Sequence, residues 1–243
     1  MKIYLEEEIE TIGTVTINAV KVKRDHTLRI FKEEFLGKHH DSPYLKILNE
    51  HKIKFNITSD STLIARCDEP IIIENKRLGY KMKYDLITFE AKLYLRTYPY
   101  KAESVHFAGF CFFNDLKNLK KKHFKRRREA YLGSSKHFIK SLYNNTLELN
   151  KYHIMLNESG KIESLYTLVE QSKNEKTYKM LIPRVYLHYN REFCSSFELN
   201  EDGQDTFTID KFGNISPAGR ILFTGELGAK RMGEALPDDY QFQ

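Results

Sequence analysis

The sequence predicts an α+β fold, mostly antiparallel sheet with one long amphipathic helix and shorter terminal helices. Two observations lead to this prediction. Strand-like runs follow one another without helical segments between them. Residues 116–145, by contrast, carry apolar side chains at roughly helical spacing. With 243 residues, the chain is long enough to bury a substantial core.

The segment 79–95, GYKMKYDLITFEAKLYL, shows the strand pattern most clearly. Tyr80, Met82 and Tyr84 share one face, whereas Lys81 and Lys83 share the other. This alternation is typical of an antiparallel strand with one solvated side. Similar strands are expected at 52–58, 61–67, 70–74, 103–113, 151–157, 164–172, 184–189 and 205–215.

Three helices complete the prediction. The segment 25–37, DHTLRIFKEEFLG, has apolar residues at helical spacing and a glycine that would end the helix. A short helix is expected within 226–240. Over 116–145, a rough apolar stripe predicts one long helix with Gly133 in its middle. The stripe consists of Leu119, Phe124, Tyr131, Phe138 and Leu142.

The net charge of +6 comes from one segment. Eight of the 39 Lys and Arg residues lie between Lys117 and Arg128, where there is no acidic residue. The other 31 are balanced by 33 Asp and Glu residues. A dedicated nucleic-acid-binding protein is usually basic over a wider surface.

The basic segment 117–128 is a candidate site for an anionic ligand, because clustered Lys and Arg gain from counterion release. On a helix, Lys121, Lys125 and Arg128 line one side and would make the contact. No aromatic residues are spaced for base stacking, which disfavours nucleic acid as the partner. An ordinary solvated helix face explains the same pattern.

A nuclease-like pattern gives an enzymatic alternative. Glu90 and Lys92 would project from the same side of one strand, and Asp68 precedes Glu90 by 22 positions. In a D…E-x-K arrangement, two carboxylates hold Mg²⁺ and the lysine orients the attacking water. A cross-strand ion pair is the simpler interpretation of these residues.

The remaining polar motifs are weaker. Ser134 and His137 would touch on a helix, but the G-x-S-x-G turn of a serine hydrolase is missing. Neighbouring His39 and His40 fit a surface loop better than a metal site. The three cysteines fit buried free thiols. We therefore expect no cofactor and no bound metal, and the sequence favours a non-enzymatic protein.

Several separated stretches of the sequence together form one recognisable pattern. They are FKEEFLG (31–37), KILN (46–49), EPIIIENKRLGYKMKYDLITFE (69–90), FAGFCFF (107–113), KRRREAYLGSSKHFIKSL (125–142) and ALPDDY (235–240). Together these stretches resemble the C-terminal region of Bacteroidetes proteins described as carboxypeptidase-like regulatory domain-containing. They occur in the order of that family across nearly the whole chain.

The resemblance implies a binding or structural module of the bacterial cell envelope, in the periplasm or at the outer membrane, with an unknown envelope protein or an anionic ligand as partner. It implies no peptidase activity. Residues 1–24 would be the exit strand and linker of a missing transthyretin-like β-sandwich, and residues 25–243 a single α+β domain. The start, MKIYLEEEIETIG, has no signal-peptide pattern, so a truncated start is expected. No run of residues is long and apolar enough for a membrane helix.

Overall fold

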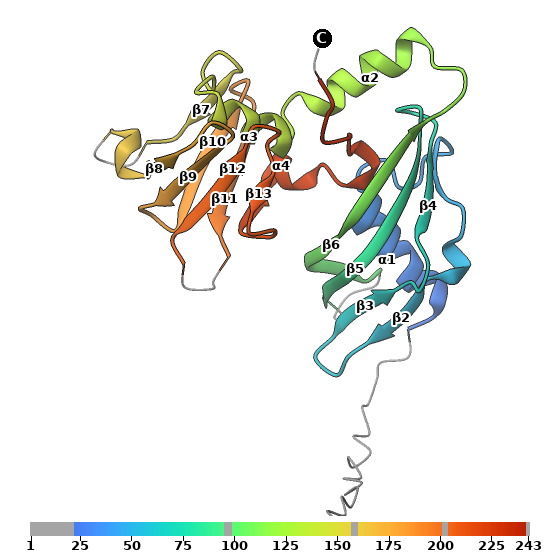
Figure 1. The fold of residues 1–243 in the computed structure, drawn as a ribbon. Helices are drawn as coiled ribbons and strands as arrows, with labels where there is room; N and C mark the ends of the chain where they lie inside the picture. The colour runs from blue at the N-terminus through green and yellow to red at the C-terminus, as the bar shows by residue number, and fades with distance from the viewer. Residues whose placement is uncertain (1–21, 95–98, 157–159, 201–203, 242–243) are drawn as a thin grey trace, which may run out of the picture.

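The computed structural model describes residues 22–94, 99–156, 160–200 and 204–241, which form two lobes (Figure 1). Within these residues the fold is mostly β, with 14 strands in three antiparallel sheets and four α-helices, the longest of 13 residues. The predicted α+β fold with one long amphipathic helix is therefore wrong. The predicted linker residues 1–21 lie outside the described part of the chain.

The first lobe contains a six-stranded sheet. Its order is β1-β4-β5-β3-β2, and β6 pairs with β5 along nearly the whole strand. Helix α1 (Arg24–Leu36), predicted from the sequence, buries Phe31 and Phe35 in this lobe. The strands are β1 (Leu45–Ile47), β2 (Lys54–Ile57), β3 (Thr62–Arg66), β4 (Ile71–Asn75), β5 (Tyr80–Tyr94) and β6 (Lys101–Asp115), and a 3-10 turn, η1, covers Glu50–Lys52.

Strand β5 confirms the predicted alternation. Tyr80, Met82 and Tyr84 are buried and the intervening Lys81 and Lys83 are exposed. A bulge at Ile87 shifts the register, since Leu86 pairs with Gly109 and Thr88 with Ala108. Inward-facing residues therefore change from even to odd numbers along the strand.

The second lobe contains two four-stranded sheets that share one core with helix α3. Their orders are β14-β11-β10-β7 and β13-β12-β9-β8. The strands are β7 (Tyr152–Ile154), β8 (Tyr166–Gln171), β9 (Glu175–Met180), β10 (Arg184–Tyr189), β11 (Phe193–Leu199), β12 (Thr206–Asp210), β13 (Ile215–Ser216) and β14 (Ile221–Thr224). The other elements are α2 (Lys121–Tyr131), α3 (Ser135–Tyr143), α4 (Gly225–Ala229), η2 (Ile162–Ser164) and η3 (Met232–Glu234).

The predicted long helix is two helices, because the chain turns between Tyr131 and Ser135. Leu132 is extended, and Gly133 has a φ of 68°, in the left-handed region that favours glycine. The Ser134 side chain then caps α3 by accepting a hydrogen bond from the backbone N–H of His137. Gly133 thus marks the break after α2, and Ser134 marks the start of α3.

The lobes are joined a second time by residues 230–234, which follow α4 and cross to the first lobe. Asn75 donates its side-chain amide to the carbonyl of Gly233 at 2.9 Å. Arg231 approaches Glu34 of α1 at 3.9 Å, and Arg77 approaches Glu234 at the same distance. We call residues 230–234 the crossing segment.

The buried apolar residues form two clusters, one in each lobe. The crossing segment and α2–α3 both connect the lobes. Whether residues 25–243 fold as the single predicted domain stays a prediction. In the described part of the chain, none of the helices has the length and apolar character to cross a membrane.

We predict that Gly133→Ala destabilises the fold. Left-handed backbone costs a non-glycine residue about 1–2 kcal/mol, and a Cβ here would also lie 2.8 Å from ring carbons of Tyr189. Gly160→Ala is the matched control, because Gly160 also has a positive φ of 65° but a Cβ added there would meet nothing within 4 Å. Urea unfolding should show the larger loss for Gly133→Ala, and equal losses would contradict the steric argument.

Candidate functional site

Helix α2 is held on the first lobe by the buried side chain of Arg127. Its Nε donates to the carbonyl of Leu78 at 2.8 Å, and one terminal nitrogen reaches the Gly79 carbonyl at 3.2 Å and the Asp115 carboxylate at 2.6 Å. The guanidinium also lies 3.7 Å from the centre of the Tyr80 ring. The side chain of Arg127 therefore donates hydrogen bonds to two carbonyls of the turn that joins β4 to β5, and these bonds hold α2 against that turn.

The inward face of α2 is mostly polar, which differs from the predicted stripe. The buried residues are His123, Arg127, Ala130 and Tyr131, whereas Phe124 is 54% exposed. His123 Nδ1 accepts the backbone N–H of Lys120 at 2.8 Å, which satisfies one of the unpaired amides at the helix start. The assignment of Phe124 to the core was wrong. The spacing of apolar residues could not indicate that a charged residue, Arg127, would be buried on the inward face.

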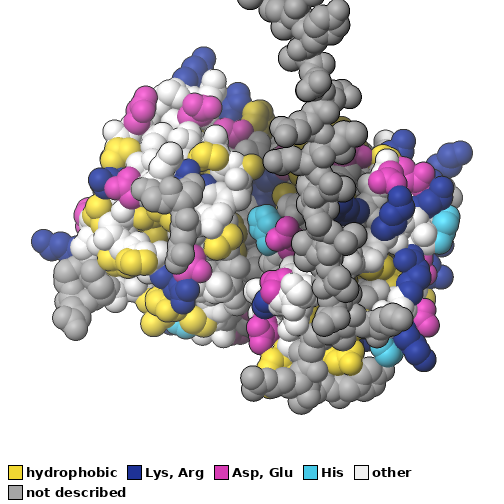
Figure 2. Space-filling model, turned by 90° about the horizontal axis from the view of Figure 1, so that it is seen from below, with side chains coloured by type: hydrophobic (Ala, Val, Ile, Leu, Met, Phe, Trp, Pro, Cys, Tyr) yellow, Lys and Arg dark blue, Asp and Glu magenta, His cyan; other side chains and the backbone are white. Residues whose placement is uncertain are grey.

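The opposite face of α2 carries the predicted binding residues. Lys121, Lys125 and Arg128 are all exposed, and 3.6 residues per turn places them on one side. Lys122 and the acidic Glu129 flank them. We call Lys121, Lys125 and Arg128 the basic ridge. Figure 2, which views the molecule from the side opposite α2, shows Lys and Arg mixed with Asp and Glu on both lobes.

We predict that Arg127→Ala lowers the free energy of unfolding by about 2–4 kcal/mol. The Leu78 carbonyl and the Asp115 carboxylate lose this donor, and the Gly79 carbonyl keeps only the backbone N–H of Leu116. Arg127→Lys should recover little of this, since an ammonium cannot reproduce the fork of the guanidinium. Lys125→Ala on the exposed face should change stability by less than about 0.5 kcal/mol. Urea denaturation measures all three, and a neutral Arg127→Ala would show that the helix is held by other contacts.

Ser134 and His137 lie close together, but in a structural arrangement. The Ser134 hydroxyl contacts the backbone of His137 rather than its ring, at 3.1 Å. The ring Nδ1 accepts the N–H of Gly133 at 3.1 Å and lies 3.0 Å from the Tyr152 hydroxyl. Since an amide can only donate, Nδ1 carries no proton and cannot serve Ser134 as a hydrolase pair would require.

Burial lowers the pKa of His137 from 6.5 to about 4, against a hydrogen bond with Asn150 that raises it. The folded chain therefore resists protonation, and the unfolded chain binds more protons between these two values. The contribution to stability is fully present above pH 6.5 and is lost as the pH falls from 6.5 to about 4.

We predict that the wild-type protein loses more stability than His137→Gln when the pH falls from 7 to 5. Glutamine retains an acceptor for Gly133 but has no proton to take up. Urea unfolding at the two pH values gives the comparison. NMR of the His137 ring should show a neutral imidazole at pH 6, and titration near 6.5 would refute the argument.

The structure separates the nuclease-like residues. Lys92 lies opposite Thr62 at the start of β3, whereas Asp68 follows the far end of that strand. Lys92 bonds Asp60 at 3.0 Å, and Asp68 bonds Lys54 at 2.6 Å. Glu90 shares the outward face with Lys92, as predicted, and is paired across the sheet with Ile64 and His106.

Hydrogen bonds lower the pKa values of the two carboxylates that pair with these lysines. Thr58, then Lys92 and Thr62, donate to Asp60 and lower its pKa, and Lys54 lowers the pKa of Asp68 in the same way. Within the described ranges, no group of three or more His, Cys, Asp or Glu side chains is placed to hold a metal ion. The geometry thus gives the nuclease hypothesis no support.

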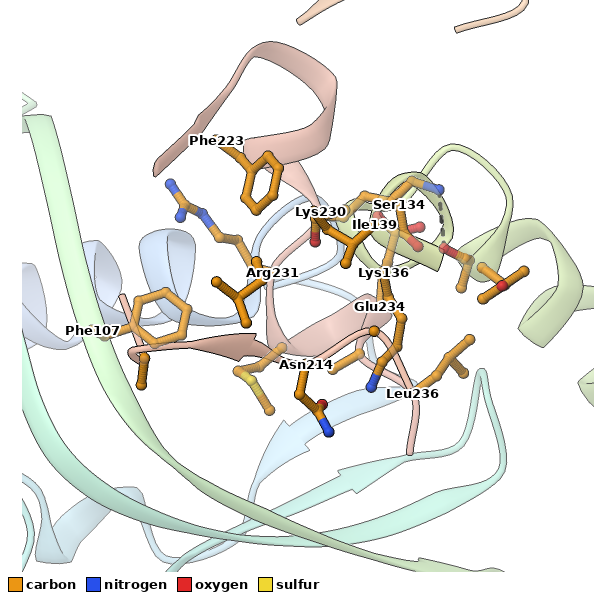
Figure 3. Close-up of a pocket in the computed structure, with 18 of the residues that line it drawn as sticks. Phe107, Ser134, Lys136, Ile139, Asn214, Phe223, Lys230, Arg231, Glu234 and Leu236 are labelled. Atoms are coloured by element: carbon orange, nitrogen blue, oxygen red, sulfur yellow. Dashed lines mark hydrogen bonds between the residues drawn. The ribbon is translucent and has the colours of Figure 1, made fainter. Parts of the chain in front are cut away.

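A cleft between the lobes was missed by the sequence analysis. It consists of two neighbouring cavities of about 520 and 770 Å³ that share Phe107, Phe223, Lys230 and Arg231 among their lining residues. Figure 3 shows Phe107 at the left of the first cavity and Phe223 above it, with Arg231 between them. No local motif could reveal this cleft, because Phe107 and the lining residues within 213–236 are more than 100 positions apart.

Two cations in the cleft have different roles. Lys230 donates to the carbonyls of Glu129, Ala130 and Leu132 at 3.2, 3.0 and 2.6 Å and thereby satisfies the end of α2. Arg231 lies 5.8 Å from the centre of the Phe107 ring and only approaches Glu34. Burial lowers the pKa of both side chains.

Comparisons of the chain with protein-family models, with curated proteins and with solved structures gave no match.

Proposed function

We propose that this chain is a non-enzymatic binding module of the bacterial cell envelope that contacts an anionic partner through the basic ridge of α2. The envelope location rests on the family resemblance. The proposed contact with an anionic partner rests on one observation. Arg127 is buried and bonded to the first lobe, whereas Lys121, Lys125 and Arg128 face solvent.

The arrangement suits a charged contact because the helix is anchored from its other side. The Arg127 bonds and the Lys230 bonds hold α2 at its middle and at its end. A ligand that bound the ridge would therefore meet cations carried by a helix that is already held in place, which reduces the backbone ordering cost of binding. Phe124, exposed beside the ridge, adds an apolar contact.

The test is retention on a heparin column. Heparin is a polyanion that has no nucleobases, so retention does not depend on base recognition. We predict that the triple change Lys121→Glu, Lys125→Glu and Arg128→Glu shifts elution to lower salt and reduces the slope of log affinity against log salt. The loss of three cation contacts should lower the magnitude of that slope by about 3. Circular dichroism checks that the variant remains folded.

The matched control reverses three exposed lysines on the first sheet, Lys46, Lys81 and Lys83, to the same total charge. A local site predicts a small change for the control and a large one for the ridge. Equal shifts would show that retention follows net charge alone, and the proposed contact would then fail.

A further inference from the structure

Two sheet edges face each other across the cleft. Strand β6 is an edge of the first sheet, since it pairs with β5 alone, and β14 is an edge of its sheet, since it pairs with β11 alone. The larger cavity is lined by residues 103–107 of β6 and by all four residues of β14. Residues of two edge strands therefore line the cleft, together with residues of α4 and the crossing segment.

Edge strands present backbone N–H and C=O groups at alternate residues away from their partner strand. Among the backbone hydrogen bonds of the described residues, none joins the free side of 103–107 to another segment, whereas the Phe223 carbonyl of β14 lies against Gly228 of α4. Such groups need water or another peptide. An extended chain is the ligand that would satisfy them in register, by adding a strand to the sheet.

The side chains of the cleft indicate what that chain carries. Phe107 and Phe223 give it apolar surface on both walls. Arg231 lines both cavities, and its approach to Glu34 at 3.9 Å is longer than a hydrogen bond, so its fork of donors suits a carboxylate. Five residues of β6 span about 17 Å, the length of a five-residue extended peptide.

We propose that the cleft binds an extended peptide segment of a partner protein, which pairs with the free edge of β6, packs apolar side chains against the exposed parts of Phe107 and Phe223, and directs a carboxylate to Arg231. This site is separate from the basic ridge and does not depend on it, so either proposal can fail alone.

The test uses synthetic heptapeptides of the pattern Thr-x-Thr-x-Thr-x-Glu, with x as Val, Leu or Phe, and fluorescence polarisation. The best binder is compared with a version N-methylated at alternate residues, which cannot complete the strand pairing. We expect N-methylation to weaken binding at least about tenfold. Hydrogen exchange should show new protection at 103–107 when the unmodified peptide binds.

The carboxylate is tested by pairing Arg231→Gln with a peptide in which an amidated Gln replaces the final Glu. Arg231→Gln should weaken the acidic peptide about tenfold and leave the amide peptide unchanged. If Arg231→Gln does not fold, Leu222→Trp tests the cleft instead. Leu222 is 36% exposed on β14, so a larger side chain should fill the cleft without disturbing the core.

Leu168→Trp is the control for that variant, since Leu168 is 43% exposed on β8 and lines neither cavity of the cleft. Leu222→Trp should abolish peptide binding and Leu168→Trp should not. Absence of binding by every peptide, equal binding after N-methylation, or a dimer formed through β6 in sedimentation would each overturn the proposal.

Discussion

The crossing segment, residues 230–234, is the constraint on which the arrangement of the lobes depends. It leaves α4 in the second lobe and makes its polar contacts in the first, where the Gly233 carbonyl accepts from the buried Asn75. In between, Lys230 satisfies three carbonyls at the end of α2. These carbonyls have no partner within the helix, so Lys230 stabilises the end of α2. The segment therefore contacts α2 and the turn after β4 while it continues from α4 in the second lobe.

The basic segment shows how one run of like charges divides between structure and surface. Arg127 is withdrawn from water, and its cost is offset by two carbonyls, a carboxylate and an aromatic face. Its neighbours Lys125 and Arg128 remain on the exposed side. The segment is therefore both the anchor of the helix and the surface proposed to meet an anionic partner.

The two proposed sites have different physical bases. The basic ridge offers charge on a rigid helix, so its binding should weaken with salt. The cleft offers backbone groups and aromatic surface, so its binding should depend on peptide conformation and much less on ionic strength. Together, the two proposed sites would bind an extended segment of one partner and an anionic group of the same or another partner.

The sequence by itself determined the elements whose signals are local. The alternation of Tyr80 to Tyr84, helix α1 with its Gly37 end and the exposure of Lys121, Lys125 and Arg128 follow from period and composition, and the structure confirms them. The break at Gly133 was also encoded locally, in a glycine followed by a capping serine, but the continuous apolar spacing of 116–145 concealed it.

Only the tertiary structure decided the burial of Arg127, the separation of Asp68 from Lys92 and the cleft. Each depends on partners distant in sequence. Arg127 is buried because a turn 48 positions earlier supplies its acceptors. Asp68 and Lys92 lie at opposite ends of β3, where they pair with Lys54 and Asp60. The cleft exists because the crossing segment sets two sheet edges opposite each other, and no periodicity within one strand records which edge remains unpaired.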